Sequence, residues 1–261
     1  MSILKELQTG KSDDIKMHNA RNPKRETASG FVISDLHIFT EWTSVEFYME
    51  KIHKAADNSD FFVLNGDIFD FKWSTLPTAE ETAEKAAGWL KNICRTSPAC
   101  SFYYILGNHD AHIKIIPALR LLEKQLKNFK WSPTHFFIGS FLFLHGDLLF
   151  KIKKTTPFHR PDDTYLKAEP KHRILSKGYN MAIGFGAHHV VTGVLRTKQC
   201  ASYSYSVLKK HSIPEMNRVS DVFIGHTHAS FSNFRFKDLT FHNTGSAVAD
   251  LHCNMINLKQ L

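Results

Sequence analysis

The feature that most constrains the fold is a series of short apolar runs, each followed at once by glycine, aspartate, asparagine or histidine. Runs such as Phe31-Val32-Ile33 and Phe61-Phe62-Val63-Leu64 are too short for helices and are rich in β-branched and aromatic residues. This composition predicts buried strands. Similar runs cover residues 103–106, 141–144 and 222–224.

Segments with helical periodicity alternate with the first of these runs. Val45, Tyr48, Met49 and Ile52 fall at i, i+3, i+4 and i+7, which predicts an amphipathic helix. Apolar stripes over 83–94 and 119–126 predict two more helices, and Thr78 with Glu81 has the spacing of a capping box. Strands that alternate with helices indicate an α/β sheet, in which the ligand crevice lies at the carboxyl ends of the strands.

Polar segments that follow the predicted strands hold the candidate site residues. They are Asp35-Leu36-His37, Gly66-Asp67 with Asp70, Gly107-Asn108-His109-Asp110, His145-Gly146-Asp147, and Gly225-His226-Thr227-His228. We expect these segments to converge at one edge. Asp35 and His37 are two positions apart, so in an extended conformation both side chains would project from the same face and could bind one ion. His226 and His228 have the same spacing.

The donor types in these segments predict a metal centre. Imidazoles mixed with carboxylates and one amide oxygen suit Mn²⁺, Fe or Zn²⁺ better than an all-oxygen Mg²⁺ or Ca²⁺ site. We expect two divalent ions, with Mn²⁺ first and Fe or Zn²⁺ as alternatives. A pair of adjacent cations needs a bridging ligand, and the carboxylate of Asp67 is the natural candidate.

The order and spelling of the segments resemble the calcineurin-like metallophosphoesterase superfamily. Its pattern is D-x-H, G-D-x-x-D, G-N-H-D/E, a further His and G-H-x-H, and the match spans Asp35 to His228. The resemblance implies an α/β (α+β) fold, a four-layer sandwich of two mixed β-sheets flanked by helices. It also implies a hydrolase in which a hydroxide bridging two metals attacks a phosphoester or pyrophosphate bond.

Carried over position by position, the resemblance implies a role for each motif residue. It assigns one metal to Asp35, His37, Asp67 and His228. It assigns the other metal to Asp67, Asn108, His145 and His226. His109, oriented by Asp70, is implied to be the catalytic acid that is not a ligand.

Within the superfamily, residues 66–73, His145-Gly146-Asp147 and Asn243-Thr244-Gly245-Ser246 look like the UDP-2,3-diacylglucosamine hydrolase group and its uncharacterised relatives. Those relatives carry a helical cap between the H-G-D and G-H-x-H segments. The resemblance implies a UDP-sugar or lipid-linked pyrophosphate as substrate. The lipid A enzymes of the group commonly carry arginine where this chain has His109.

The predicted cap insertion, at about 151–218, carries the basic character of the chain. Between Lys151 and Ser220 there are thirteen Lys or Arg and four Asp or Glu, and the whole chain has a net charge of +8. Such a segment suits an anionic partner. Candidate phosphate-binding residues in it are Lys153, Lys154, Arg160, Lys171 and Arg173. The same charge suits nucleic acid, so a nuclease or phosphodiesterase is the alternative; a non-catalytic binding scaffold is the third hypothesis.

Composition sets the remaining expectations. Residues 1–29 are predicted to form a polar N-terminal arm, and 30–261 the metallophosphoesterase domain. We expect no transmembrane segment and no signal peptide, and hence a cytoplasmic protein, with the apolar stretch 181–195 as a candidate peripheral membrane contact. The scattered cysteines, Cys94, Cys100, Cys200 and Cys253, predict reduced thiols.

Overall fold

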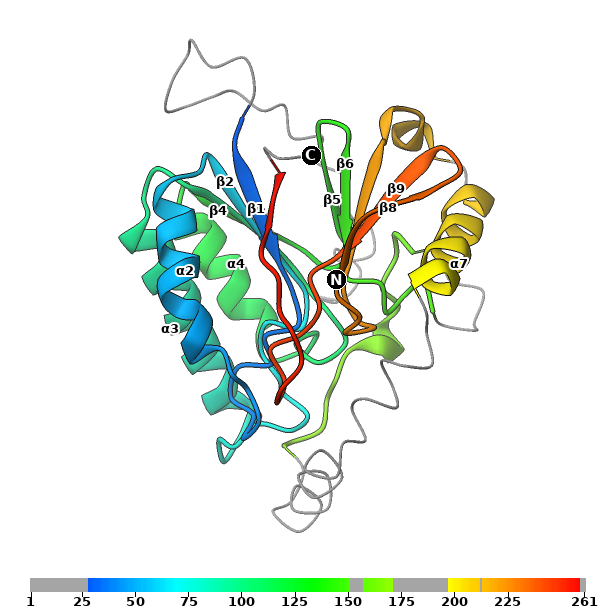
Figure 1. Cartoon of the computed structure of the whole chain (residues 1–261). Coiled ribbons are helices and arrows are strands. Elements are labelled where there is room, and N and C mark those ends of the chain that lie inside the picture. The colour runs from blue at the N-terminus through cyan, green and yellow to red at the C-terminus, as the bar shows by residue number, and fades with distance from the viewer. Residues whose placement is uncertain (1–27, 151–156, 171–196, 212, 259–261) are drawn as a thin grey trace.

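The computed structural model describes residues 28–150, 157–170, 197–211 and 213–258. Within them the chain forms two five-stranded sheets that face each other, with helices on both outer sides (Figure 1). The order of strands is β10-β1-β2-β3-β4 in the first sheet and β5-β6-β7-β9-β8 in the second.

The first sheet is parallel except at one edge. Its strands are β1 (Gly30–Ile33), β2 (Phe61–Asn65), β3 (Ser101–Ile105), β4 (Phe129–Ser132) and β10 (Ile256–Asn257). Strands β1 to β4 pair in parallel, and β10 adds antiparallel to β1. The carboxyl ends of β1, β2 and β3 therefore lie at one edge of this sheet.

The second sheet is mixed. Its strands are β5 (His135–Ile138), β6 (Phe141–Leu144), β7 (Asp221–Ile224), β8 (Phe231–Phe236) and β9 (Leu239–Asn243). Strands β6, β7 and β9 are parallel, whereas β5 and β8 pair antiparallel at the two edges. The carboxyl ends of β6 and β7 consequently lie together as well.

Helices cover the outer face of each sheet. The long helices are α2 (Glu46–Asp57), α3 (Ala79–Thr96), α4 (Ile116–Gln125) and α7 (Thr197–Lys210). Figure 1 shows α2, α3 and α4 against the first sheet and α7 against the second. Two short 3₁₀ helices, η1 (Asp162–Thr164) and η2 (Pro214–Arg218), lie in the connections. The predicted four-layer sandwich of two mixed sheets is confirmed.

The strand sequences explain the layers because successive side chains point to opposite faces. On β2, Phe62 and Leu64 belong to the cluster beneath the helices, whereas Phe61 and Val63 belong to the cluster between the two sheets. On the second sheet, Val222 packs outward, in the cluster that includes residues of α7. Since β2 is buried on both faces, its continuous apolar run fits an interior parallel strand.

The cap of α3, the edge strand β4 and the cysteines can be compared with what the sequence predicts. Thr78 caps α3 by accepting a hydrogen bond from the Glu81 N–H, as the capping-box spacing predicted. Strand β4 was not predicted, although Phe129 and Trp131 alternate about the exposed Lys130. All four cysteines lie in the described residues, and all are free and buried.

The predicted cap is only partly described. Helix α7 falls inside the predicted range 151–218, yet it packs against β8 and forms part of the outer layer of the second sheet. Residues 151–156 and 171–196, which include the apolar stretch 181–195, lie outside the described residues, as does the arm at 1–27. Among the helices of the described residues, none has the length and apolar character to cross a membrane.

Candidate metal centre

The candidate metal centre lies where the carboxyl ends of strands from both sheets meet. Asp35 and Asp67 lie in the loops that follow β1 and β2, and Asn108 lies after β3. His145 and His226 lie in the loops that follow β6 and β7 of the second sheet. The structure therefore brings together side chains from loops that are far apart in the sequence and belong to different sheets.

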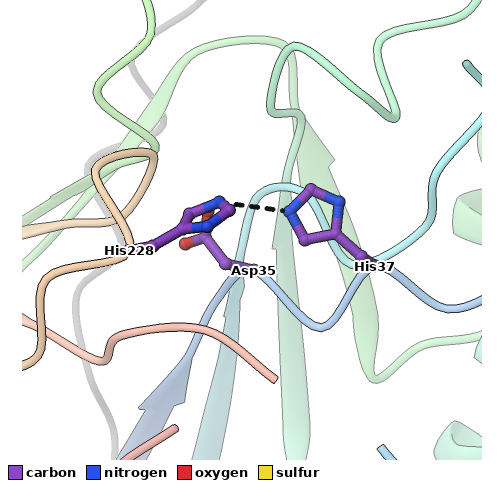
Figure 2. Close-up of side chains that lie close together, drawn as sticks. All are labelled: Asp35, His37 and His228. Atoms are coloured by element: carbon purple, nitrogen blue, oxygen red, sulfur yellow. Dashed lines mark hydrogen bonds and ion pairs between the residues drawn. The ribbon is translucent and has the colours of Figure 1, made fainter. Parts of the chain in front are cut away.

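One group of candidate ligands consists of Asp35, His37 and His228 (Figure 2). Their donor atoms all lie within 4.8 Å of one another. The Nε2 atom of His228 lies 3.3 Å from Oδ1 of Asp35 and 3.3 Å from Nε2 of His37. With Asp67, these residues make up the set that we call the first ligand set.

A second group consists of Asp67, His145 and His226, whose donor atoms also lie within 4.8 Å of one another. The Nε2 atom of His145 lies 3.1 Å from Oδ2 of Asp67. The side-chain oxygen of Asn108 is buried and accepts no hydrogen bond from the described residues. Asp67, Asn108, His145 and His226 make up the second ligand set.

Asp67 belongs to both sets. Its Oδ2 atom lies 3.1 Å from Nε2 of His145 and 4.0 Å from Nε2 of His37. Its other oxygen, Oδ1, accepts a hydrogen bond of 2.7 Å from the N–H of His109. Although burial alone would raise it, the neighbouring imidazolium of His145 holds the pKa of Asp67 well below its usual range. Asp67 is therefore an ionised carboxylate with one oxygen free to face both groups.

Hydrogen bonds at Nδ1 orient two of the imidazoles. Nδ1 of His145 lies 3.1 Å from the carbonyl oxygen of Asn65, which can only accept, so this nitrogen carries the proton of the neutral ring. Nδ1 of His37 lies 3.0 Å from Asp70 in the same way. The lone pair of each neutral ring is then on Nε2, the atom nearest to Asp67. A histidine that binds a metal usually has this arrangement.

A lone pair that faces a carboxylate is repelled unless a cation or a proton lies between them. Burial opposes the charged ring, yet Asp67 and Asp35 raise the pKa of His145 to about 10, so a proton fills this role in the metal-free protein. Burial and the nearby His145 lower the pKa of His226 to about 4, so its imidazole is neutral and ready to bind a metal. The donor set therefore fits a pair of divalent cations that would displace a proton on binding.

The backbone at the candidate ligands corrects one step of the sequence analysis. Asp35, His37, Asp67, His226 and His228 have φ angles of 54°, 48°, 50°, 65° and 56°. The pairs at 35/37 and 226/228 are therefore not extended, and their side chains converge through left-handed residues. Such residues cost about 1–3 kcal/mol each and concentrate at functional sites. Aspartate and histidine are among the residues that tolerate this region best.

Two motif glycines permit the close approach of the loops. A Cβ atom on Gly107 would clash with the carboxylate of Asp67, and one on Gly225 would clash with the carboxylate of Asp35. Neither carboxylate can give way, because each is held by hydrogen bonds from the backbone of the facing loop, at His109 and His226 respectively. This explains why the ligands of these segments follow glycine.

The Asn243–Ser246 segment supports loops that carry ligands of both sets. Asn243 donates to the carbonyl of Gly225 and to Thr227, and so holds the loop that carries His226 and His228. Thr244 accepts a hydrogen bond from the N–H of Ser34, and Ser246 donates to the carbonyl of Asp35. These residues act on the backbone of the ligands rather than as donors to a metal.

His109, which is half-buried, and the buried Asp70 form a pair beside the first ligand set. Nδ1 of His109 lies 2.8 Å from Oδ2 of Asp70, and the His109 side chain is 18% exposed. Burial opposes protonation, but Asp70 and Asp67 raise the pKa of His109 to about 9, so the ring is an imidazolium at neutral pH. The same Asp70 also holds His37, which couples the catalytic candidate to a metal-ligand candidate.

Asp110 has a structural role that the local sequence pattern does not reveal. This buried carboxylate accepts hydrogen bonds from the N–H groups of Ile68 and Gly107 and from the hydroxyl of Tyr104. Burial and the neighbouring Asp67 raise the pKa of Asp110 to about 7. It thus ties the loop after β2 to the loop after β3. Its signal in the sequence was its place directly after His109.

Arg160 does not have the environment expected of a phosphate-binding residue. Its side chain is buried, at 1% exposure, and makes a bidentate ion pair with Asp147. A guanidinium held in this way has little capacity left for a phosphate. Four further candidate phosphate-binding residues lie outside the described residues: Lys153, Lys154, Lys171 and Arg173.

Comparison with known proteins shows which family this chain matches. The model of the calcineurin-like phosphoesterase family matches residues 31–230, which include every candidate ligand. A dimetal phosphatase from Danio rerio is among the solved structures similar to this chain, with 11% identity, a TM-score of 0.43 and coverage of 88% of this chain and 95% of that chain. No curated protein matches significantly.

The match covers well over half of the chain, and it coincides with the two ligand sets. The protein is therefore a hydrolase of the metal-dependent phosphoesterase class. It belongs to the calcineurin-like phosphoesterase family.

Proposed function

We propose that the protein hydrolyses a phosphoester or pyrophosphate bond with two divalent cations that share Asp67. One cation is held by Asp35, His37, Asp67 and His228, and the other by Asp67, Asn108, His145 and His226. The observation that carries this proposal is the position of Asp67 Oδ2, which lies within 4.0 Å of an imidazole nitrogen from each set. Bound cations would lower the pKa of water toward neutrality and offset charge on the phosphoryl oxygens.

In this proposal His109 is the general acid. Its Nδ1 atom is engaged by Asp70 at 2.8 Å, which leaves Nε2 as the nitrogen that donates its proton to the departing oxygen. Asp70 fixes the orientation of the ring and favours its charged form. In this step the oxygen of water bonds to phosphorus and water releases a proton to solvent. The ester or anhydride bond breaks, and the leaving oxygen takes the proton of His109, which the imidazole regains from solvent.

Mn²⁺ is the proposed metal, with Fe and Zn²⁺ as the alternatives. The candidate donors are imidazole nitrogens, carboxylate oxygens and one amide oxygen, a mixture that suits these ions. Cys253 is a thiol that feels the charge of Asp35, and burial together with Asp35 raises its pKa to about 12. It therefore remains a neutral thiol, which is a poor ligand for these ions.

The proposed substrate is a UDP-sugar or a lipid-linked pyrophosphate, recognised by the basic segment 151–196. This segment connects β6, which leads into the second ligand set, to α7 on the outer layer. We propose that Lys153, Lys154, Lys171 and Arg173 bind its phosphates. The segment would thus act as the substrate-recognition cap of a domain that spans residues 30–261.

Metal removal and restoration test the catalytic proposal. The protein is stripped with a chelator, and hydrolysis of p-nitrophenyl phosphate and bis(p-nitrophenyl) phosphate is followed while Mn²⁺ is added back. We expect no hydrolysis without metal and full recovery at two equivalents. Full recovery at a single equivalent, or hydrolysis by the stripped protein, would contradict the proposal.

A panel of substrates tests the specificity. Mn²⁺-loaded protein is offered UDP-sugars, phosphomonoesters, cyclic nucleotides and single-stranded nucleic acid, and ¹⁸O-labelled water locates the broken bond. The proposal predicts preferred cleavage of a pyrophosphate. Preferred cleavage of nucleic acid, with affinity that falls steeply as salt rises, would instead favour a nuclease, the alternative that the basic segment also suits.

A further inference from the structure

Arg160 is a buried cation that the proposed chemistry does not use. Its Nη1 and Nη2 atoms donate to Oδ2 and Oδ1 of Asp147 at 2.8 and 3.1 Å. Nη2 also donates to the carbonyl of Leu106 at 2.9 Å, and Nε donates to the carbonyl of Pro133 at 2.9 Å. Four of the five N–H groups of the guanidinium are therefore engaged by protein acceptors.

The acceptors of Arg160 lie next to ligands of the second set. Leu106 immediately precedes Gly107-Asn108, in the loop that leaves the first sheet after β3. Asp147 follows His145 by two residues, in the loop that leaves the second sheet after β6. Pro133 lies between β4 and β5, where the chain passes from one sheet to the other. One guanidinium thus connects the two sheets at the loops that carry Asn108 and His145.

The position of Arg160 itself is fixed by packing. Phe158, two residues earlier, stacks on Phe137 of β5 with ring centroids 6.2 Å apart and contacts His135 at 4.8 Å. After Arg160, the chain forms η1 and reaches Leu166, whose N–H and carbonyl bond to Ala111 and Ile113 near α4. The segment around Arg160 is therefore anchored to the second sheet before it and to the loop between β3 and α4 after it.

We infer that Arg160 is a positioning residue of the metal centre, which sets the spacing between Asn108 and His145 and so assembles the second ligand set. This inference rests on the proposed two-cation function. Arginine suits the task because its planar fork can bind a carboxylate in bidentate fashion and a carbonyl at the same time. Lysine, with a single ammonium group, cannot keep all of these contacts.

An ion pair that only stabilised the fold would behave differently. Its loss would lower the melting temperature and leave the metal affinity of the folded protein unchanged. Support of a ligand from outside the coordination shell has another signature, because its loss commonly lowers metal affinity 10- to 100-fold while the fold persists. The two roles are therefore separable by measuring metal binding and thermal stability on the same variants.

The test uses the metal-free full-length protein and its Arg160→Lys and Arg160→Met variants, titrated with Mn²⁺. Isothermal titration calorimetry counts the binding events, and electron paramagnetic resonance distinguishes an exchange-coupled Mn²⁺ pair from isolated ions. We expect the wild type to bind two ions as a coupled pair. In Arg160→Lys we expect one event to be about 10- to 100-fold weaker, with the signal of isolated Mn²⁺.

Controls keep the outcomes distinct. Arg95→Lys makes the same chemical change on the exposed side of α3 and should bind both ions like the wild type. If Arg160→Met fails to fold, Arg160→Lys carries the test alone. Two unchanged binding events in Arg160→Lys would overturn the inference, and so would a lysine variant that cannot fold without metal. A wild type that binds fewer than two ions would instead overturn the proposed function.

Discussion

The two ligand sets of the metal centre differ in which parts of the chain hold their ligands in place. In the first set, His37 is held by Asp70, and Asp35 accepts a hydrogen bond from its neighbour Ser34. In the second set, the loops that carry Asn108 and His145 are joined by Arg160, which lies outside all the metal-binding motifs. The first set is thus supported by its own motifs and by the Asn243–Ser246 segment, whereas the second also depends on Arg160, which lies between two motifs in the sequence.

The two groups of candidate ligands do not differ in burial. Each has two buried members and one half-buried histidine, His228 in the first group and His226 in the second. The side chains of His228 and of the nearby His109 are 22% and 18% exposed. The contrast between the sets therefore lies in their support and not in their exposure.

Substitution of Asp67, the ligand that both sets share, should impair cation binding at both sets at once. Asp67→Ala deletes the carboxylate that faces both groups, so we expect it to lose paired cation binding and at least about 10³-fold in kcat/KM, since metal catalysis supplies several kcal/mol. Elemental analysis and steady-state kinetics measure the two effects. Glu84→Ala on the exposed face of α3 is the control. Normal activity in Asp67→Ala would refute the bridging role.

Loss of the proposed acid, His109, should lower the catalytic rate without loss of metal binding. His109→Gln removes the proton donor but no proposed ligand, so we expect kcat to fall about 10²- to 10⁴-fold while both cations stay bound. Asp70→Asn should do more, because Asp70 also holds His37 of the first set. The readouts are kcat and metal content after gel filtration. Departure of a cation from His109→Gln would show that His109 is a ligand.

Neutralisation of the proposed cap should affect neither ligand set. The double substitution of Lys153→Gln and Lys154→Gln removes two proposed phosphate contacts, and hydrogen bonds to charged groups contribute about 1.5–3 kcal/mol each. We expect KM for a pyrophosphate substrate to rise about tenfold or more, with unchanged metal content. A Lys124→Gln variant on α4 serves as the control. An unaltered KM would exclude these lysines from substrate binding.

The pH dependence should report the charged form of His109. Asp70 and Asp67, against the effect of burial, raise the pKa of this ring to about 9. A general acid must be protonated, so kcat should hold below this pKa and fall as the pH rises through it. Bound cations lower the pKa of a nearby imidazolium, which places the descending limb at or below pH 9. The same limb in His109→Gln would assign it to another group.

The smallest expected effect is the release of a proton from the second ligand set when metal binds. His145, with its pKa raised to about 10, is charged at pH 7.5 and must lose a proton to bind a metal, whereas His226, with its pKa lowered to about 4, is already neutral. Calorimetric titration in buffers of different ionisation enthalpy should therefore show release of at least one proton. Binding heats that do not depend on the buffer would contradict these charge states.

Much of the fold followed from the sequence because its signals are local. The strands before the ligands are continuous apolar runs, and the helices carry apolar stripes at helical spacing. Strand β4 was not predicted because it is a short edge strand with Lys130 at its centre. Only one of its faces is buried, so its apolar pattern is weak. The expected cap range also included α7, since a helix of the outer layer and a helix of a cap have similar amphipathic patterns.

At the centre, the sequence predicted which ligands meet but not how. The spacing of Asp35 and His37 suggested an extended pair, whereas left-handed backbone brings their side chains together. The link from Arg160 to Leu106 and Asp147 depends on the relative position of two sheets, which no local pattern encodes. The basic character of its segment suggested a surface role, although this one cation is buried and paired.

The most direct test of the central claim is a crystal structure of the Mn²⁺-loaded protein with the metals located by anomalous scattering. We predict two manganese peaks about 3.5–4 Å apart, bridged by the Asp67 carboxylate. Asn108 and His145 should contact one peak, and His37 and His228 the other. A single peak, or two peaks of which only one touches Asp67, would contradict it.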